Sequence, residues 1–519
     1  MIRRRPNRRT FLFFFTTHLY CKNMARTQSV FATASHSKPL VAQAADACRH
    51  CIRDLDFAGI DGPDLREASY LLEDVDLQLR VLELYHDQYF DNPKWRHNAV
   101  AGCLSSLLEY FDTMTLNNCD AAVSQGNELK AFKMRVKRGL CDLREQARKL
   151  DKTLGFLSGP EESGGFPLPD ATNSRNVPSG GLTLLAVDGG GVRGLVSLRI
   201  LKAIMDEANR ENGTSKAKTP AECFKLAGGT STGGLICIML FRLSMSIDEA
   251  ITAYKSLSQT LFQPSFISKY LGGAYIRTMF GLSWYEGSSL EHAVRDEVVA
   301  QGLDPNATLL DHSSVPGTEG CQVFVTSVRS RDNFALRFRS YRFPDGSLPT
   351  YSSATIIQAA RATSAAPFYF PPATIGRTEF WDGALANNNP VDELWAEKSL
   401  LFPRWITDKP VVKCVLSLGT GRFDPSRKKR SWIASHPAIS KGAQLLENLT
   451  NVENVHRRFD QLMRAEGVWY FRFNPPTTED VDLAEYREEK LAGLEADVER
   501  YLERPHIKVM LRLCAQLLG

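Results

Sequence analysis

The sequence lacks a strong charge bias, a paired cysteine pattern and any long apolar run. Its formal net charge is only +4 over 519 residues, whereas a dedicated nucleic-acid binder usually carries a larger, clustered positive charge. The 11 cysteines are odd in number and scattered, so we expect free thiols in a reducing compartment rather than a disulfide framework. No stretch approaches the roughly 18–20 uninterrupted apolar residues of a membrane-spanning helix.

Motifs for metals and nucleotides are also missing. Cys48 and Cys51 form a CxxC, but no second Cys or His pair follows at zinc spacing, so we interpret both as packing residues of a helix. There is no EF-hand loop and no Walker A loop. We therefore expect chemistry that needs neither a metal nor another cofactor.

The first 45 residues contain no acid. Several arginines precede a short apolar run at residues 11–15, as in a transit peptide or a weak signal peptide. The alternatives are a disordered tail, or an upstream extension with initiation at Met24. We interpret residues 1–40 as a basic disordered leader of an intracellular, cytoplasmic protein, and leave mitochondrial or secretory targeting open.

Residues 41–157 predict a helical bundle or coiled-coil-like module that could recruit a protein partner or self-associate. From residue 129 the apolar side chains recur at steps of three and four, which places them on one helix face. They are Leu129, Phe132, Val136, Leu140, Leu143, Ala147, Leu150 and Leu154. A linker follows at 158–181, where 13 of 24 residues are Gly, Pro or Ser, which disfavours regular structure.

Residues 182–519 alternate short apolar runs with helical patterns. Strands are expected at 182–187, 225–227, 323–328, 336–341, 380–381 and 411–418, and helices at 194–210, 233–243, 483–503 and 505–518. This alternation is typical of an α/β layered sheet.

The first chemical motif is a GxSxG at residues 229–233, placed between an apolar run and a helical pattern. Gly229 and Gly233 remove side chains that would clash in a tight strand–turn–helix connection, and Ser231 would project from the turn. Since the pentapeptide also occurs by chance, it does not identify a nucleophile by itself.

The second motif is Asp188, Gly189, Gly190, Gly191, Val192, Arg193 and Gly194, after a strand and at the start of a helix. Successive glycines let backbone N–H groups converge beside the positive end of a helix, as a developing oxyanion requires. The same residues match the GxGxxG of dinucleotide-binding folds. That alternative needs an acid at the end of a second strand, but Asp206, Glu207 and Glu211 lie in a helical pattern.

The third motif starts at Asp382 and Gly383, where a short apolar strand meets a Gly/Asn-rich turn that ends in Pro390. Asp382 would lie at the carboxyl edge of a strand, where open α/β sheets bind ligands. Taken alone, this Asp is better explained as the cap of the next helix, with Asn389 and Pro390 in the turn.

The order of these motifs resembles the patatin-like phospholipases. Another block of that family is similar to residues 359–367 and 370–372, and the resemblance covers about 182–400. It implies a three-layer α/β/α sandwich with a mostly parallel central sheet, here preceded by the all-α module, and hydrolysis of the acyl esters of phospholipids or other lipids. It does not extend to residues 1–157.

The resemblance assigns roles to particular residues. Ser231 would attack the ester carbonyl, Asp382 would take its proton, and the N–H groups of Gly190, Gly191 and Val192 would hold the oxyanion. A free Asp is a poor base, so we expect a desolvated site that raises its pKa. Arg193 is expected to clamp the loop rather than to react.

Two other hypotheses remain at this stage. One is an α/β-hydrolase with a Ser–His–acid triad, in which His436, His456 or His506 would be the base; His456 is interpreted as a surface residue. The other is a signalling or scaffold protein in which the lipase domain is the effector.

Two segments are candidates for lipid contact. The four cations at 427–430 precede Trp432 and could dock on a membrane surface, or simply be solvated. The apolar residues 261–275 could line an acyl-chain cleft or belong to the ordinary core.

Overall fold

The computed structural model describes residues 37–58, 63–89, 98–114, 125–158, 181–213, 217–262, 285–311, 320–402, 412–423 and 452–519. The chain forms two compact units, Met1–Pro169 and Asp170–Gly519. Most of the predicted leader and linker, the basic loop 427–430 and His436 lie outside the described residues. No helix of the described part is long and apolar enough to cross a membrane.

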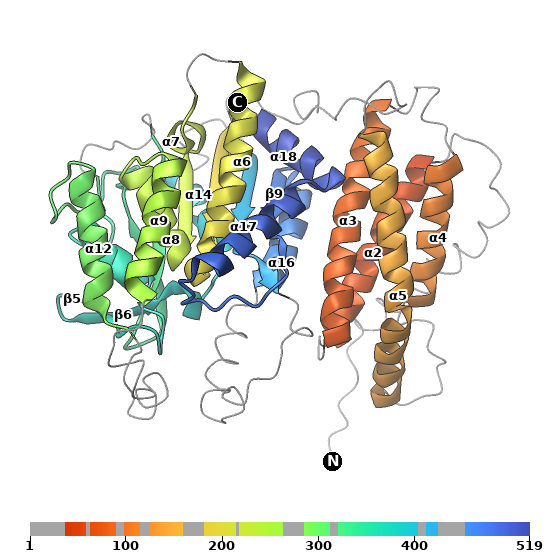
Figure 1. Cartoon of the computed structure of the whole chain (residues 1–519), viewed down its shortest axis with the longest axis horizontal. Coiled ribbons are helices and arrows are strands. Elements are labelled where there is room, and N and C mark those ends of the chain that lie inside the picture. The colour runs from red at the N-terminus through yellow and green to blue at the C-terminus, as the bar shows by residue number, and fades with distance from the viewer. Residues whose placement is uncertain are drawn as a thin grey trace. The chain divides into compact units, whose positions relative to one another are not determined.

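The first unit is built from helices, as the periodicity predicted. They are α2 (Ser37–Ala58), α3 (Pro63–Tyr89), α4 (Asn98–Met114) and α5 (Gln125–Leu157) (Figure 1). Helices α2 and α5 each pack against both α3 and α4. The predicted face of α5 is buried from Val136 to Leu154, and Cys48 and Cys51 are buried as well. The Cys48 thiol donates to the Leu72 carbonyl at 3.2 Å, which confirms the packing interpretation.

The second unit contains a mixed sheet of eight strands. They are β1 (Leu182–Val187), β2 (Leu226–Thr230), β3 (Gln322–Arg329), β4 (Phe334–Arg339), β5 (Ala373–Ile375), β6 (Thr378–Asp382), β7 (Val412–Leu418) and β9 (Trp469–Phe473). The order is β5-β6-β3-β2-β1-β7-β9, and β4 pairs with β3. From β3 to β9 along this path every pair is parallel, whereas β4, β5 and β6 pair antiparallel. The short strands β8 (Arg422–Phe423) and β10 (Pro476–Thr477) form a separate pair.

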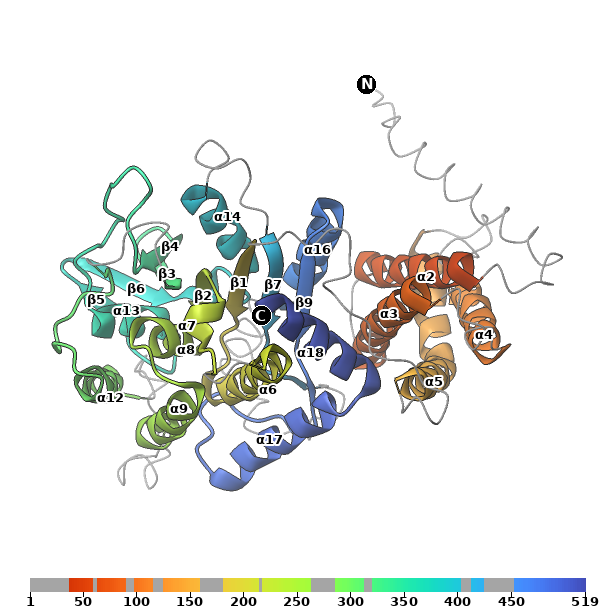
Figure 2. The same ribbon diagram turned by 90° about the horizontal axis from the view of Figure 1, so that it is seen from above.

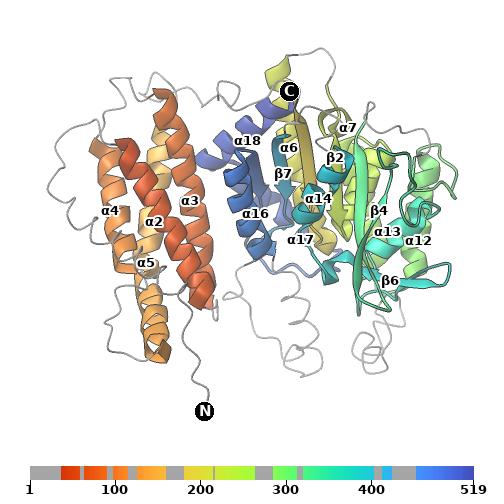
Figure 3. The ribbon, with the colours of Figure 1, turned by 180° about the vertical axis from the view of Figure 1, so that it is seen from behind.

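Helices cover both faces of this sheet (Figures 2 and 3). They are α6 (Gly194–Asn212), α7 (Pro220–Cys223), α8 (Thr232–Cys237), α9 (Ile247–Phe262), α12 (Gly287–Ala300), α13 (Ile356–Thr363), α14 (Val391–Leu401), α16 (Val452–Glu466), α17 (Glu488–Leu502) and α18 (Pro505–Leu518). On one face α14 and α16 pack on a core that includes Leu184, Phe324 and Val415. On the other face α6 and α18 contact β7, and α8 contacts β1 and β3. The expected three-layer α/β/α fold with a mostly parallel sheet is confirmed.

Some boundaries differ from the sequence prediction. Strand β2 continues to Thr230 instead of ending at residue 227, and α8 begins at Thr232. In this extension, Gly228 packs directly against the ring of Phe324. A Cβ at residue 228 would lie 2.1 Å from that ring, so only glycine fits there. The helix expected from residue 483 begins at Glu488.

Candidate active site

The glycine-rich loop connects β1 to α6 at the carboxyl end of the parallel strands. It runs through a short 3₁₀ turn, η6 (Gly191–Arg193), before α6 begins at Gly194. Gly191 has φ +56°, and a Cβ there would lie 2.1 Å from the carbonyl oxygen of Leu483. Only glycine fits this position, both because of its backbone conformation and because another backbone approaches so closely.

Ser231 occupies a sharp turn between β2 and α8. Its φ of 55° and ψ of −126° are unusual for a residue with a side chain, and such backbone strain is concentrated at functional sites. A Cβ on Gly229 would lie 2.2 Å from the Gly233 carbonyl oxygen, and one on Gly233 would lie 2.3 Å from that of Val187. The two flanking glycines therefore let the turn close against β1, as the motif predicted.

Asp382 ends β6 and caps the next turn, η8 (Gly383–Leu385), by accepting the Ala384 N–H at 2.8 Å. It is 1% exposed. Burial raises the pKa of this carboxyl from 3.8 to about 7, although hydrogen bonds from the Ser231 side chain and the Ala384 N–H act in the opposite direction. The Ser231 side chain therefore lies near enough to Asp382 to act on its pKa, and that pKa moves in the direction expected from the sequence.

The three N–H groups proposed for the oxyanion site differ in their availability. The Gly190 N–H donates to Thr232 Oγ1 at 3.1 Å, and the Val192 N–H donates to the Leu483 carbonyl at 2.9 Å. Within the described part of the chain, the Gly191 N–H has no hydrogen-bond partner. Gly191 is therefore the donor that this structure leaves open to a ligand.

Arg193 is the last residue of the 3₁₀ turn η6, and its side chain contacts the glycine-rich loop. Its Nε donates to the Gly190 carbonyl at 3.3 Å, which is the clamp-like contact expected from the sequence. Burial lowers the pKa of this guanidinium, although the carboxylates of Asp480 and Asp482 act against the effect.

Several residues that shape the site were not anticipated. Thr363 Oγ1 accepts the Ser231 N–H at 3.0 Å, and the Tyr254 hydroxyl donates to the Gly191 carbonyl. Leu483 covers the glycine loop through its carbonyl. Thr363 lies in the block 359–367 that was singled out as a family signal, whereas nothing in the local sequence marks Tyr254 or Leu483.

An apolar pocket opens beside Ser231. Its lining includes Leu235, Leu257, Leu261, Phe262, Leu290 and Phe370, together with Gly191 and Leu483. Leu261 and Phe262 are the described residues of the segment proposed as an acyl-chain cleft, and both line this pocket; residues 263–275 lie outside the described part. The pocket therefore joins the serine hydroxyl and the open Gly191 N–H to a surface that suits a hydrocarbon chain.

The candidate histidines lie elsewhere in the fold. His456, expected at the surface, lies on α16, is partly exposed and contacts the Tyr470 hydroxyl of β9 at 3.1 Å. His506, on α18, is fully buried. Among the described residues, no group of three or more His, Cys, Asp or Glu side chains could hold a metal ion.

The segment that carries Ser231 and Asp382 is similar to known proteins. Residues 185–395 match the family model described as patatin-like phospholipase. The chain is 30% identical over 328 residues to the rat protein named calcium-independent phospholipase A2-gamma, covering 62% of this chain and 39% of that protein. It is 27% identical over 391 residues to phospholipase A I of Arabidopsis thaliana, covering 66% of this chain and 28% of that protein. The chain thus spans well under half the length of these relatives.

Proposed function

We propose that this chain, whose residues 185–395 match the patatin-like phospholipase family model, is a phospholipase A-type lipid acyl hydrolase working through an acyl-serine intermediate. The observation that carries the proposal is a buried Asp382 whose pKa of about 7 is influenced by the Ser231 side chain, next to an apolar pocket that Ser231 lines. A base acts best when its pKa lies near the working pH. The names of the relatives support a phospholipid as substrate.

In the first half of the reaction, Ser231 Oγ attacks the ester carbonyl carbon while Asp382 accepts the hydroxyl proton. The carbonyl oxygen becomes an oxyanion, to which the Gly191 N–H donates, and removal of one such donor typically slows catalysis about 10²–10³-fold. When the C–O bond breaks, protonated Asp382 returns its proton to the leaving alkoxide. The fatty-acyl chain, now esterified to Ser231, occupies the apolar pocket.

In the second half, water replaces the alcohol. Asp382 takes a proton from the water, hydroxide adds to the acyl carbon, and the same N–H holds the second oxyanion. The bond to Ser231 Oγ then breaks, the serine regains its proton, and a free fatty acid leaves. The scheme needs no histidine, because the Asp382 carboxylate lies near enough to Ser231 to take the hydroxyl proton directly.

Product profiling tests the proposal. Wild type, Ser231→Ala and Asp382→Asn are incubated with mixed phospholipid vesicles, and free fatty acids and lysophospholipids are measured by mass spectrometry. Both products should form with wild type and fall to background with either variant. Loss of activity in His456→Ala or His506→Ala, with Asp382→Asn still active, would instead favour the Ser–His–acid triad.

The substrate also implies peripheral contact with a membrane surface.

We extend the proposal to an intracellular location. The nine described cysteines are free, which supports it, because disulfides are rare in reducing compartments. Residues 41–157 are proposed to bind a protein partner or a second copy of the chain. Sedimentation with vesicles and the molar mass of the protein in solution test these two points.

A further inference from the structure

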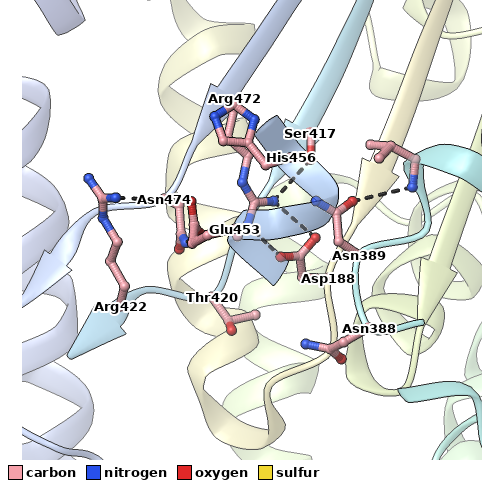
Figure 4. Close-up of polar contacts among 12 residues, drawn as sticks. Asp188, Asn388, Asn389, Ser417, Thr420, Arg422, Glu453, His456, Arg472 and Asn474 are labelled. Atoms are coloured by element: carbon pink, nitrogen blue, oxygen red, sulfur yellow. Dashed lines mark hydrogen bonds and ion pairs between the residues drawn. The ribbon is translucent and has the colours of Figure 1, made fainter. Parts of the chain in front are cut away.

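A buried ion pair lies at the start of the glycine-rich loop, and the reaction scheme above does not use it. Asp188 follows β1, and Arg472 belongs to β9 (Figure 4). The guanidinium donates from Nη1 to Oδ1 at 3.0 Å and from Nη2 to Oδ2 at 2.7 Å. The two side chains are 2% and 5% exposed. Paired hydrogen bonds of this kind fix orientation as well as distance.

Arg472 is itself held in place. Its Nη1 donates to Ser417 Oγ at 2.9 Å, and its Nη2 lies 3.6 Å from a Glu453 oxygen. Glu453 also accepts from Asn474 Nδ2 at 2.7 Å. Burial would lower the pKa of Arg472, but the carboxylates of Asp188 and Glu453 outweigh it and raise the pKa above its usual range. The guanidinium is therefore charged and has little freedom to move.

The residues that follow Asp188 are fixed in turn. The Gly189 carbonyl accepts from Asn388 Nδ2 at 3.0 Å and from Thr420 Oγ1 at 3.3 Å. Gly190 lies so close to Thr420 that a Cβ would approach its hydroxyl oxygen to 2.2 Å. The chain from Asp188 to Gly190 is thus anchored residue by residue, and the next N–H is the open donor of Gly191.

We propose that Arg472 is a positioning residue for the oxyanion site: it fixes the Asp188 carboxylate and thereby the direction in which the Gly191 N–H points. The inference rests on the proposed function, because it gives that N–H a role in catalysis. Arg472 lies outside the segment 185–395 that matches the family model. The C-terminal part of the chain therefore contributes to the geometry of the site as well as to the sheet.

The proposal predicts that removing one partner alone does the most harm. Without Arg472, the Asp188 carboxylate is left buried with no paired cation, and it must take up a proton or move toward water. Either response disturbs the residue directly before the glycines. Replacing both partners by neutral side chains avoids the unpaired buried charge, so Asp188→Asn combined with Arg472→Met should do no more harm than Arg472→Met alone.

A second buried pair in the same unit provides a matched control. Arg339 on β4 donates to Glu397 on α14 from Nε at 2.7 Å and from Nη2 at 2.6 Å, and the side chains are 11% and 0% exposed. Arg339→Met therefore also removes a buried cation from a buried carboxylate, although Glu397 keeps the Arg337 guanidinium at 2.9 Å and the Tyr341 hydroxyl at 2.6 Å. Arg339 does not contact the glycine-rich loop, so this variant measures how much the loss of a buried ion pair destabilises the fold.

The experiment uses the full chain and two readouts. The first is the rate at which a fluorophosphonate modifies Ser231, since this attack also develops an oxyanion. The second is hydrogen exchange of peptides covering residues 186–195, which does not require activity. Arg472→Met should slow modification by about 10-fold or more and speed exchange in the loop. Arg472→Lys should lie between, because Lys keeps the charge but not the paired geometry. Arg339→Met should leave both readouts near wild type, even where its melting temperature falls.

Equal modification rates and equal loop exchange in Arg472→Met and Arg339→Met would overturn the proposal and reduce the pair to a structural one. If Arg472→Met does not fold, Arg472→Lys carries the same comparison. If Ser231 of wild type is not modified at all, the proposed function fails. In that case unchanged loop exchange in Arg472→Met or Arg472→Lys would also refute the positioning role, and faster exchange would support it.

Discussion

Asp382→Asn should abolish hydrolysis and at the same time stabilise the protein at neutral and alkaline pH. The carboxyl has a pKa of about 7 in the folded chain against a usual value of 3.8. Each pH unit of difference corresponds to about 1.4 kcal/mol, so ionisation of this buried group opposes folding by about 4 kcal/mol above pH 7. An Asn side chain has nearly the same shape, can accept the Ala384 N–H, and carries no charge.

The direction in which stability changes with pH follows from proton binding by Asp382 in the folded and unfolded chains. Between pH 3.8 and 7 the folded chain keeps the Asp382 proton while the unfolded chain releases it, so wild-type stability falls as pH rises through this window. Below it both states are protonated, and the variant should gain nothing. The gain should therefore grow from pH 4 to pH 8 and then level off.

Thermal and urea unfolding at a series of pH values measure the effect. Asp332→Asn is the matched control, because Asp332 is exposed and hydrogen bonds from Arg329 lower its pKa; it should lose stability at neutral pH rather than gain it. A stability difference between Asp382→Asn and wild type that is independent of pH, or a loss at pH 8, would refute the reasoning.

Three further outcomes are expected. For wild type, kcat/KM should rise with pH through a midpoint of about 7, since the base must be ionised; a flat profile between pH 5 and 9 would contradict this. Gly191→Ala should eliminate activity on phospholipid vesicles, because the residue has φ +56° and a Cβ would lie 2.1 Å from the Leu483 carbonyl oxygen. The control is Gly213→Ala, which should retain activity because Gly213 has a similar φ of +57° but no atom within 4 Å of its Cβ position. Thr363→Val should lower the free energy of unfolding by about 1–3 kcal/mol and slow catalysis, because the Ser231 N–H loses its acceptor; a fully active and equally stable variant would show that this bond does not hold the turn.

The parts of the site that could be predicted from sequence are local ones. Glycines on either side of Ser231 and the consecutive glycines after Asp188 constrain the backbone within a few residues, so their turns follow from short motifs. The placement of Asp382 at a strand end was predictable for the same reason. Its proximity to Ser231 came from the family resemblance, because no local rule pairs residues that far apart.

The parts that could not be predicted depend on tertiary packing. Arg472 pairs with Asp188 across 284 positions, and an isolated Arg in a strand pattern does not identify its partner. Leu483 was expected in a helix, yet its carbonyl accepts the Val192 N–H. His456 was expected at the surface, and its half-burial results from how α16 packs against β9. In each case the contact joins two separate elements of the chain, and neither sequence indicates that it pairs with the other.

The acyl-serine intermediate is the most direct test of the account. A reaction with a phospholipid is quenched in acid, and the digested protein is mapped by peptide mass spectrometry. The account predicts a fatty-acyl ester on Ser231 in the wild-type protein. An acyl group on any other residue, or fatty acid release with Ser231→Ala at the wild-type rate, would contradict it.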